Sequence, residues 1–392
     1  MTHLKFRAVL LVVATTLSLP SVYGHDLEIE FLLGADSNPN ELQPRFEYIN
    51  TAVPYGKSRI ELSHMPVRTG FYYELEAKSS LYQDEPTAIS NPKHGEETTA
   101  HADLGFKWRP RMKYGRARYK FELNYNARDT TFVDNSTGDI ATFGGEEIPD
   151  RFDASWAGAS ISGEIPISEE ANFVFDLDAK DKQYESYETL GLSNLDYLQY
   201  NLEMGFEKWI WPRTELITLI SAGAREYVDK RTRDDQGAIV ANSNLEYTFL
   251  GVDNSLEYSI TDRWKWKLGF EVNQRKDNED GYYDTSAAEV FTRLQYRNGK
   301  YVKFVFNAAY VKRRYDNIDQ VLNITEEEMR DREGFRIKGE FVRNMYEWTR
   351  VPFDLVFGFE AVSYENSNPD FTYDRGEVYF GARWRPFDLL DK

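Results

Sequence analysis

The sequence predicts an all-β protein, namely a transmembrane up-and-down antiparallel β-barrel of about 16–18 strands. Three observations support this fold class. Segments of about ten residues alternate apolar and polar side chains, and this is the length that a tilted strand needs to cross the hydrocarbon of a membrane. Short and long connections separate these segments in turn, and the chain begins with a segment typical of exported proteins.

The N-terminal segment predicts a secretory signal peptide over residues 1–24. Two basic residues, Lys5 and Arg7, precede a short apolar core, and small or tolerated residues stand before His25, where cleavage is expected. The alternative, a membrane anchor, is weaker because the apolar core is short and no basic flank follows it. The predicted domains are therefore a signal peptide at 1–24 and an outer-membrane β-barrel at 25–392.

The alternation is clearest in residues 264–275. Every second residue from Trp264 to Val272 is apolar, whereas Lys265, Lys267 and Glu271 lie between them. Successive side chains of a strand point to opposite faces, so one face of this segment is apolar and the other is charged or small. A soluble sandwich alternates in the same way, whereas a membrane barrel turns the apolar face to lipid and the polar face to a wet lumen. The pattern recurs at 119–126, 173–180, 200–207, 302–310, 335–341, 353–361 and 378–384.

The connections between these segments favour the barrel over the sandwich. Short connections are predicted at 168–170, 211–213, 261–263 and 298–300, and long polar ones at 83–97, 130–150, 230–241, 276–286, 315–332 and 364–374. Short periplasmic turns and long outer loops are typical of outer-membrane barrels, whereas Greek-key crossings do not sort loops by length. A helical turn is expected at 324–330, within the loop 315–332.

The candidate strands number about seventeen, and an even number, sixteen or eighteen, is expected of a single-chain barrel. The doubt lies in three short candidates at 26–34, 45–53 and 58–64. A barrel of this size leaves a lumen that its own side chains do not fill.

Composition narrows the possible functions. The formal charge of -18 becomes about -20 when residues 1–24 lose two basic residues and no acidic one, so a nucleic-acid partner is not expected. The chain has no cysteine, which excludes a disulfide scaffold, a thiolate nucleophile and thiolate metal ligands. The aromatic content of 15% suits the girdles that outer-membrane barrels carry at both interfaces.

The sequence predicts no catalytic residue, no cofactor site and no metal site, and hence no enzyme. Ser63 and His64 are neighbours in a strand and point to opposite faces. His101 and Asp103 share a face, about 7 Å apart, which suits an ordinary polar pair. Asp36 and its neighbours offer oxygen ligands for calcium, but without the spacing of a calcium loop.

The candidate functional site is the lumen face. Lipid exposure would cost each charge about 2–4 kcal/mol at the bilayer midplane, so the charged positions of the alternating segments are expected to face the lumen. The alternative is that these charges pair across neighbouring strands and only line a wet interior. The lumen-lining residues predicted are Arg118, Lys120, Glu122, Lys265, Lys267, Glu271, Arg275, Arg336, Lys338, Glu340 and Arg383.

Two segments carry a family resemblance. The early motif Gly34-Ala35-Asp36-Ser37-Asn38 and the closing segment 376–384 resemble an outer-membrane β-barrel porin family, some of whose members are associated with exopolysaccharide export. The resemblance implies a barrel in the outer membrane of a Gram-negative bacterium. It also implies outer-membrane lipid, the barrel assembly machinery and periplasmic export partners as contacts. The chain departs from the usual terminal aromatic residue, since five residues follow Phe387.

These observations lead to an ordered set of functions. The first is a porin-like channel, a conduit for exopolysaccharide or for other polar solutes across the outer membrane. The alternative from a different class is a structural or adhesive barrel whose acidic surface loops contact partners. A barrel hydrolase ranks third.

Overall fold

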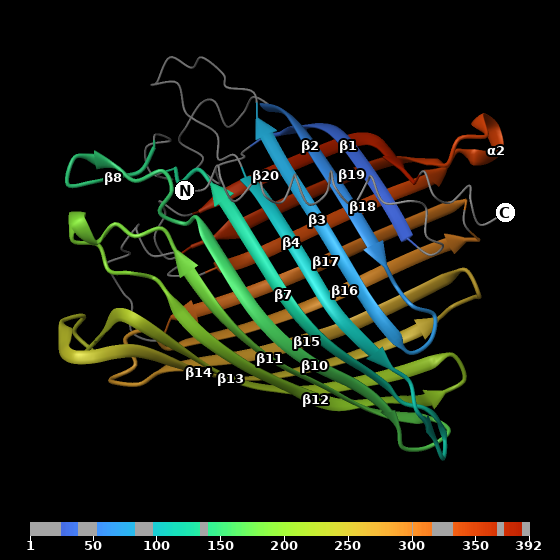
Figure 1. The fold of residues 1–392 in the computed structure, drawn as a ribbon, viewed down its shortest axis with the longest axis horizontal. Helices are drawn as coiled ribbons and strands as arrows, with labels where there is room; N and C mark the ends of the chain where they lie inside the picture. The colour runs from blue at the N-terminus through green and yellow to red at the C-terminus, as the bar shows by residue number, and fades with distance from the viewer. Residues whose placement is uncertain are drawn as a thin grey trace.

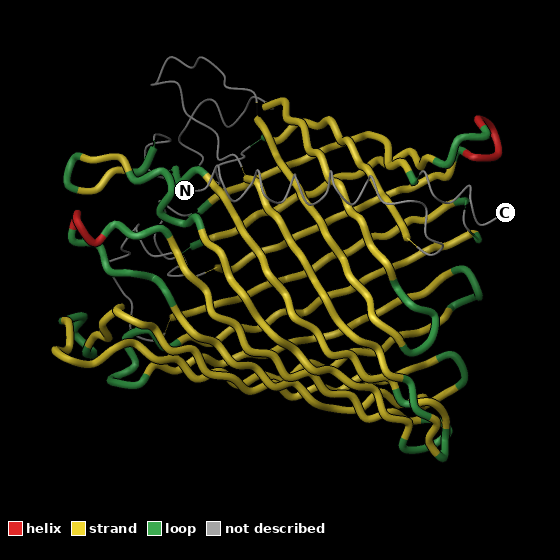
Figure 2. The backbone as a smooth tube through the Cα atoms, viewed as in Figure 1, coloured by secondary structure: helices red, strands yellow, loops and turns green. Residues whose placement is uncertain are grey.

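A computed structural model describes residues 25–37, 53–82, 97–133, 140–299, 301–315, 332–366 and 372–385. Sixteen antiparallel strands form one closed barrel in which each strand pairs with the next along the chain, and the last pairs with the first (Figures 1 and 2). This confirms the predicted fold class and settles the strand number at sixteen. Among the described residues, no helix is long and apolar enough to cross a bilayer.

The barrel strands are β1 (His25–Asp36), β2 (Val53–His64), β3 (Gly70–Tyr82), β4 (Glu97–Trp108), β7 (Arg118–Thr130), β10 (Ala154–Pro166), β11 (Ala171–Tyr184), β12 (Tyr197–Trp211), β13 (Thr214–Arg233), β14 (Ile239–Ser259), β15 (Trp264–Asp277), β16 (Thr285–Asn298), β17 (Val302–Tyr315), β18 (Arg332–Asn344), β19 (Phe353–Glu365) and β20 (Tyr373–Trp384). Two small hairpins, β5 (Arg111–Met112) with β6 (Gly115–Arg116) and β8 (Thr142–Phe143) with β9 (Glu146–Glu147), lie outside the barrel sheet, as do the helical turns η2 (Glu188–Leu190) and α2 (Tyr346–Thr349).

The apolar face of each strand has no protein cover. On β15, Trp266, Leu268, Phe270 and Val272 are 37%, 43%, 45% and 49% exposed, whereas Arg275 on the other face is buried. Rows of large apolar side chains are this exposed on many strands, from Phe31 on β1 to Phe380 on β20. An apolar surface of this extent needs a non-aqueous environment, and a bilayer supplies it.

The four predicted short connections all join consecutive strands: β10 to β11, β12 to β13, β14 to β15 and β16 to β17. They lie at one end of the barrel, together with α2, and the longest connections lie at the other end (Figures 1 and 2). This sorting fits the predicted up-and-down topology.

The segment 230–241, predicted as a long loop, is instead mostly strand. β13 continues to Arg233 and β14 starts at Ile239, with Arg231 paired to Asn244 across irregular register. The tight turn between them is stabilised by the side chain of Asp234, which accepts hydrogen bonds from the backbone of Gln236 and Ala238 at 3.0 and 2.8 Å. The polar composition of this hairpin reflects a position beyond the membrane rather than a lack of regular structure.

Two strands, β1 and β2, occupy the region where three short candidates were expected. The candidates 26–34 and 58–64 fall within β1 and β2. The third, 45–53, lies outside the described residues except for Val53, which begins β2. The predicted signal peptide at 1–24, the helical turn at 324–330, and the loops 83–97 and 315–332 apart from their end residues also lie outside the described residues.

Small apolar cores lie toward the long-loop end of the barrel. One buried cluster joins the side chains of five tyrosines and one leucine, namely Tyr197, Tyr227, Leu245, Tyr247, Tyr283 and Tyr315. A second joins Phe132, Ala141, Ile148, Phe152, Leu192 and Leu195 from two connections at this end. The connections at this end are therefore packed structures with interiors of their own.

Candidate functional site: the polar face of the barrel

Directly opposed residues in an antiparallel sheet share a face, so the register assigns every strand residue to one side. One row of opposed residues runs through nine strands without a break: Lys120, Ser162, Asp176, Glu203, Ser221, Gly251, Asn273, Ala287 and Arg313. We call the side that carries this row the polar face. It is the concave side of the sheet, since Arg336 on β18 reaches Glu289 on β16 at 3.8 Å across the intervening β17.

All eleven residues predicted to line the lumen lie on the polar face. They are Arg118, Lys120 and Glu122 on β7, Lys265, Lys267, Glu271 and Arg275 on β15, Arg336, Lys338 and Glu340 on β18, and Arg383 on β20. Period-two alternation alone placed them, because the apolar side of each segment is unambiguous.

Many of these charges pair with an opposite charge. Contacts include Arg118 with Glu164 at 3.0 Å, Lys265 with Glu257 at 2.6 Å, Lys338 with Glu360 at 3.4 Å and Lys120 with Glu122 at 2.5 Å. For these residues the alternative interpretation, cross-strand pairing within a wet interior, describes the geometry well.

Pairing is densest where the barrel closes, on β20 and β1 to β3. Arg59 contacts three carboxylates, those of Glu28, Glu61 and Glu76. Arg383 contacts Glu28 and Glu30, at 3.2 and 2.6 Å. This wall of the barrel is therefore a network of matched charges.

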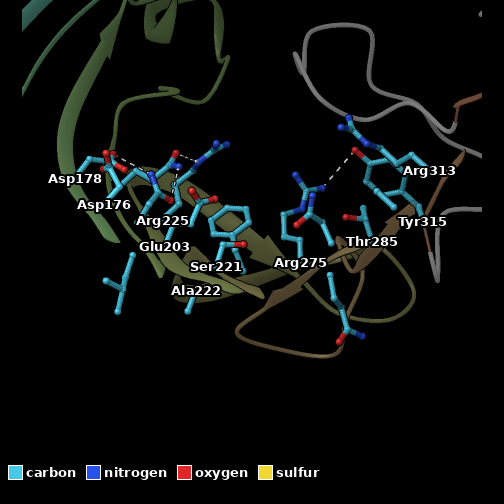
Figure 3. A pocket seen from close by; sticks show the side chains of 17 residues that line it. Asp176, Asp178, Glu203, Ser221, Ala222, Arg225, Arg275, Thr285, Arg313 and Tyr315 are labelled. Atoms are coloured by element: carbon cyan, nitrogen blue, oxygen red, sulfur yellow. Dashed lines mark hydrogen bonds between the residues drawn. The ribbon is translucent and has the colours of Figure 1, made fainter. Parts of the chain in front are cut away.

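The opposite wall, from β11 to β17, is different and contains a cavity of about 540 Å³. Carboxylates of Asp176, Asp178 and Glu203 stand on one side of the cavity (Figure 3). Guanidinium groups of Arg225, Arg275 and Arg313 complete its charged lining, with Arg275 and Arg313 on the far side in this view (Figure 3).

On the acidic side, two carboxylates have no bonded partner. Asp176 and Glu203 are directly opposed across β11 and β12, and neither side chain makes a hydrogen bond or ion pair with any described residue. Like charges in direct opposition destabilise a sheet, so this arrangement is not explained by sheet stability. Asp178, in contrast, accepts a hydrogen bond from the Asn201 side chain at 3.0 Å.

A hydrogen-bonded relay joins this side to the first arginine. Asp178 binds Asn201, Gln199 donates to Asn201 at 3.0 Å, and the Nε of Arg225 donates to Gln199 at 3.0 Å. The guanidinium of Arg225 also lies 4.3 Å from the centre of the Tyr197 ring. These contacts fix its orientation.

The second arginine is held by the tyrosine cluster. Arg275 lies 4.3 Å from the centre of the Tyr247 ring and donates hydrogen bonds to the Tyr315 hydroxyl and the Tyr283 carbonyl, both at 3.3 Å. Planar cations thus stand opposite carboxylates across a cavity that also exposes amide and hydroxyl groups. Such a lining binds water and small polar solutes and orients their dipoles.

The alternation pattern missed two of the cavity residues. Arg225 follows Ala222, Gly223 and Ala224, and these small residues hide the apolar and polar sides of β13. Arg313 stands between Lys312 and Arg314, so three successive cations obscure which one belongs to the polar face. Only the strand register resolves both positions.

His101 and Asp103, which were expected to share a face, are in direct contact. The Nε2 of His101 lies 2.8 Å from a carboxylate oxygen of Asp103, and its Nδ1 lies 2.6 Å from the side-chain oxygen of Asn126. Both ring nitrogens thus have partners within the barrel wall. Among the described residues, no group of three or more His, Cys, Asp or Glu side chains is arranged to hold a metal ion.

The motif that carries the family resemblance joins the ends of the barrel. Asp36 is fully buried, and its carboxylate lies 2.7 Å from Arg375 on β20. Ser37 exchanges two hydrogen bonds with Gly376, one through its backbone amide at 2.8 Å and one through its hydroxyl at 2.7 Å. The motif is therefore a clamp between β1 and β20, and its last residue, Asn38, lies outside the described residues.

No protein-family model matches the chain, and no curated protein matches it by sequence. Its fold is similar to those of several solved outer-membrane proteins. A bacterial polysaccharide outer membrane secretin is 10% identical with a TM-score of 0.44, covering 93% of this chain and 99% of that one. OccAB1 from Acinetobacter baumannii is 10% identical with a TM-score of 0.45, covering 93% and 98%. The outer membrane protein opdK from Pseudomonas aeruginosa is 8% identical with a TM-score of 0.44, covering 93% and 100%.

Proposed function

We propose that the protein is a passive channel for small polar solutes in the outer membrane of a Gram-negative bacterium. One observation carries this proposal: a closed barrel of sixteen strands is apolar on its convex side and charged on its concave side. The convex side requires lipid, and the concave side requires water. A barrel of this strand number leaves space along its axis for an aqueous path.

The eleven predicted residues, in this proposal, line that path. The paired charges, such as Lys265 with Glu257, keep the wall hydrated and rigid. The cavity between β11 and β17 is where a solute meets charges that are not neutralised by an ion pair in the described part of the chain, above all Asp176 and Glu203. These two carboxylates are the residues we expect to set ion selectivity.

Conductance of the purified protein in planar bilayers tests the channel. The double variant Asp176→Asn/Glu203→Gln is expected to lower the cation-to-anion permeability ratio by roughly a factor of two or more, because fixed negative charge concentrates cations in the path. The double variant Lys265→Glu/Lys267→Glu is expected to raise the same ratio. Reversal potentials in a salt gradient measure both shifts.

A matched control is Glu169→Gln/Glu170→Gln, which removes two carboxylates from an exposed turn outside the strands. It should leave the reversal potential unchanged. A barrel that folds and inserts but conducts no ions would contradict the channel proposal. It would favour the structural or adhesive alternative, in which the acidic outer connections contact a partner.

A conduit for exopolysaccharide, served by periplasmic export partners, is the narrower form of the proposal. It requires the path to admit a polymer. Swelling of vesicles that contain the protein, in oligosaccharides of increasing length, measures the size that enters. A sharp cut-off at one or two sugar units would leave only the channel for small solutes.

A hydrolase is the least supported function. The polar pair His101 and Asp103 is engaged on both ring nitrogens and lies within a strand of the barrel wall. Lipid-hydrolase and protease assays on the refolded protein test this alternative. We also propose that the barrel assembly machinery inserts the protein, as it does other barrels of this architecture.

A further inference from the structure

One exposed surface has a charge opposite to that of the whole chain. The connection between β4 and β7 forms a small hairpin, residues 109–117, which we call the basic hairpin. It contains Arg109, Arg111, Lys113 and Arg116 and no acidic residue, in a protein whose formal charge is -18. It extends past the rim of the barrel at the short-turn end (teal, lower right of Figure 1).

The hairpin is anchored rather than loose. Arg109 donates a hydrogen bond to the Val67 carbonyl at 2.6 Å, and its backbone amide donates to the Thr69 hydroxyl at 3.1 Å. At the other side Ala117 is fully buried and donates to the Pro110 carbonyl at 3.0 Å. The hairpin and the turn between β2 and β3 therefore form one unit with a fixed shape.

The cations of this unit are available. Arg111, Lys113 and Arg116 are exposed, and none of their side chains makes a hydrogen bond or ion pair with any residue that the structure describes. Arg68, in the adjoining turn, is likewise exposed and without such a contact. Lys113 lies 4.7 Å from the centre of the Tyr114 ring, a contact that leaves its ammonium group open to other ligands.

Large apolar side chains are interleaved with these cations. Met112 is 41% exposed, Tyr114 is 43% exposed, and Val67 in the anchoring turn is 85% exposed. Exposure of such apolar side chains to water is unfavourable, so water alone does not account for their presence on these turns. A surface that mixes basic and apolar or aromatic residues is typical of segments that lie in the interface of an anionic membrane.

The position of the hairpin fits this interpretation. It begins one residue after Trp108, which is 46% exposed and stacks on Tyr119 at 5.3 Å. Other tryptophans near strand ends at the same rim are Trp211, Trp264, Trp266 and Trp384. Such a belt marks the level of the lipid headgroups, so the basic hairpin stands at the height of their phosphates.

We infer that the basic hairpin binds the phosphate groups of anionic phospholipids in the adjacent leaflet, with Arg111, Lys113 and Arg116 as the ligands and Met112 and Tyr114 inserted beside them. The contact offsets locally the repulsion between an acidic protein and an anionic surface. An acidic soluble polymer or protein would also meet these cations, but it would leave the apolar side chains in water. The inference rests on the membrane location proposed above.

Lipid selectivity of the full-length protein in mixed phosphatidylcholine and phosphatidylglycerol vesicles tests it. Spin-labelled phosphatidylglycerol should associate with the barrel roughly threefold more strongly than spin-labelled phosphatidylcholine at low salt. The variant Arg111→Gln/Lys113→Gln/Arg116→Gln should reduce this ratio to about one, and salt at about 1 M should do the same to the unaltered protein, because the screening length is then only about 3 Å.

The matched control is Arg213→Gln/Arg263→Gln/Arg297→Gln, which removes the same charge from exposed residues at the same end of the barrel. It should keep the phosphatidylglycerol preference. Equal loss in both variants, or no loss in the hairpin variant, overturns the inference. Conductance is recorded first, so a failure of the lipid result in conducting barrels is distinct from a failure of the channel proposal.

A second measurement leaves all hairpin charges in place. Because the chain has no cysteine, Met112→Cys provides a unique site for an environment-sensitive fluorophore. Its emission should shift to the blue in vesicles that contain phosphatidylglycerol and not in phosphatidylcholine alone. A shift that a soluble polyanion produces in phosphatidylcholine, and that phosphatidylglycerol does not, would assign the hairpin to a polymer partner and overturn the lipid assignment.

Discussion

Asp153 is a carboxyl group whose burial has a measurable consequence. It stands directly before β10, outside the membrane-spanning strands, and is 5% exposed. Burial raises its pKa to about 7, and the nearby acids Asp129, Asp150 and Glu185 act in the same direction. The hydrogen bond that its Oδ1 accepts from the Thr130 amide, at 2.8 Å, opposes the shift but does not cancel it.

The raised pKa of Asp153 makes the local stability of this loop region depend on pH. The folded state favours the neutral acid, so its stabilising contribution is complete below the ordinary pKa of 3.8 and is lost as the pH rises through about 7. We expect the Thr130 amide to exchange hydrogen about tenfold faster at pH 8 than at pH 5, after correction for intrinsic exchange. Asp153→Asn should remove this difference and slow exchange at pH 8.

The exposed neighbour Asp150 provides the comparison, because Asp150→Asn should retain most of the pH dependence. A flat pH profile of exchange in the unaltered protein, or an unchanged profile in Asp153→Asn, would contradict this role of Asp153.

At the scale of the residue, the sequence predicts which side of a strand a residue takes, as for Lys265 and Lys267. It does not predict partners such as the three carboxylates around Arg59, because these come from separate strands.

At the scale of the element, two glycines of β20 differ in the space that a larger side chain would have. A Cβ atom on Gly381 would lie 1.9 Å from the Phe31 carbonyl oxygen of β1, whereas one on Gly376 would meet only the Ser37 hydroxyl, at 3.6 Å. Gly381 therefore allows β1 to approach closely where the sheet closes, and Gly376 does not have this role.

We expect Gly381→Ala to lower the free energy of unfolding by roughly 1–3 kcal/mol, the usual cost of overpacking. Gly376→Ala should change it by much less. Urea titration of the barrel in phospholipid vesicles, followed by tryptophan fluorescence, measures both. Equal effects of the two alanines would mean that β1 moves away at no cost.

Elements were predictable wherever one face of a strand is wholly apolar, as in β7, β15 and β20. Elements without that contrast leave no such pattern in the sequence. The polar hairpin at the end of β13 and β14 resembles a loop in composition, because its strands project beyond the lipid and need no apolar side. The basic hairpin was also missed, since four residues in its two short strands carry no period.

At the scale of the whole molecule, barrel closure depends on the clamp between β1 and β20. The fully buried Asp36 lies against Arg375, which also contacts Glu377 at 3.0 Å. Asp36 belongs to the early motif, and Arg375 directly precedes the closing segment 376–384. Nothing in a single sequence joins them, because pairing between the first and last strands follows only from the closed topology.

Arg375→Gln should lower the free energy of unfolding by roughly 3 kcal/mol, because a buried carboxylate then loses its cation. The control is Arg213→Gln, which breaks an exposed pair with Asp262 at 3.3 Å and should cost less than about 1 kcal/mol. The same urea titration compares them. A loss of unfolding free energy no larger than that of the control would show that the contact between Asp36 and Arg375 does not stabilise the closed barrel.

The seam between β1 and β20 also sets the order of events during biogenesis. Ile29 pairs with Trp384, so the edge of β1 leaves the ribosome long before its partner exists. Until β20 is made, the backbone N–H and C=O groups on the free edges of the sheet have no partner. These edges can then pair with the wrong strand or with another chain. Contacts so remote along the chain form slowly. A barrel that has not yet closed is therefore prone to aggregate. Folding in the cell should require a chaperone that holds β1 until the final residues have been made.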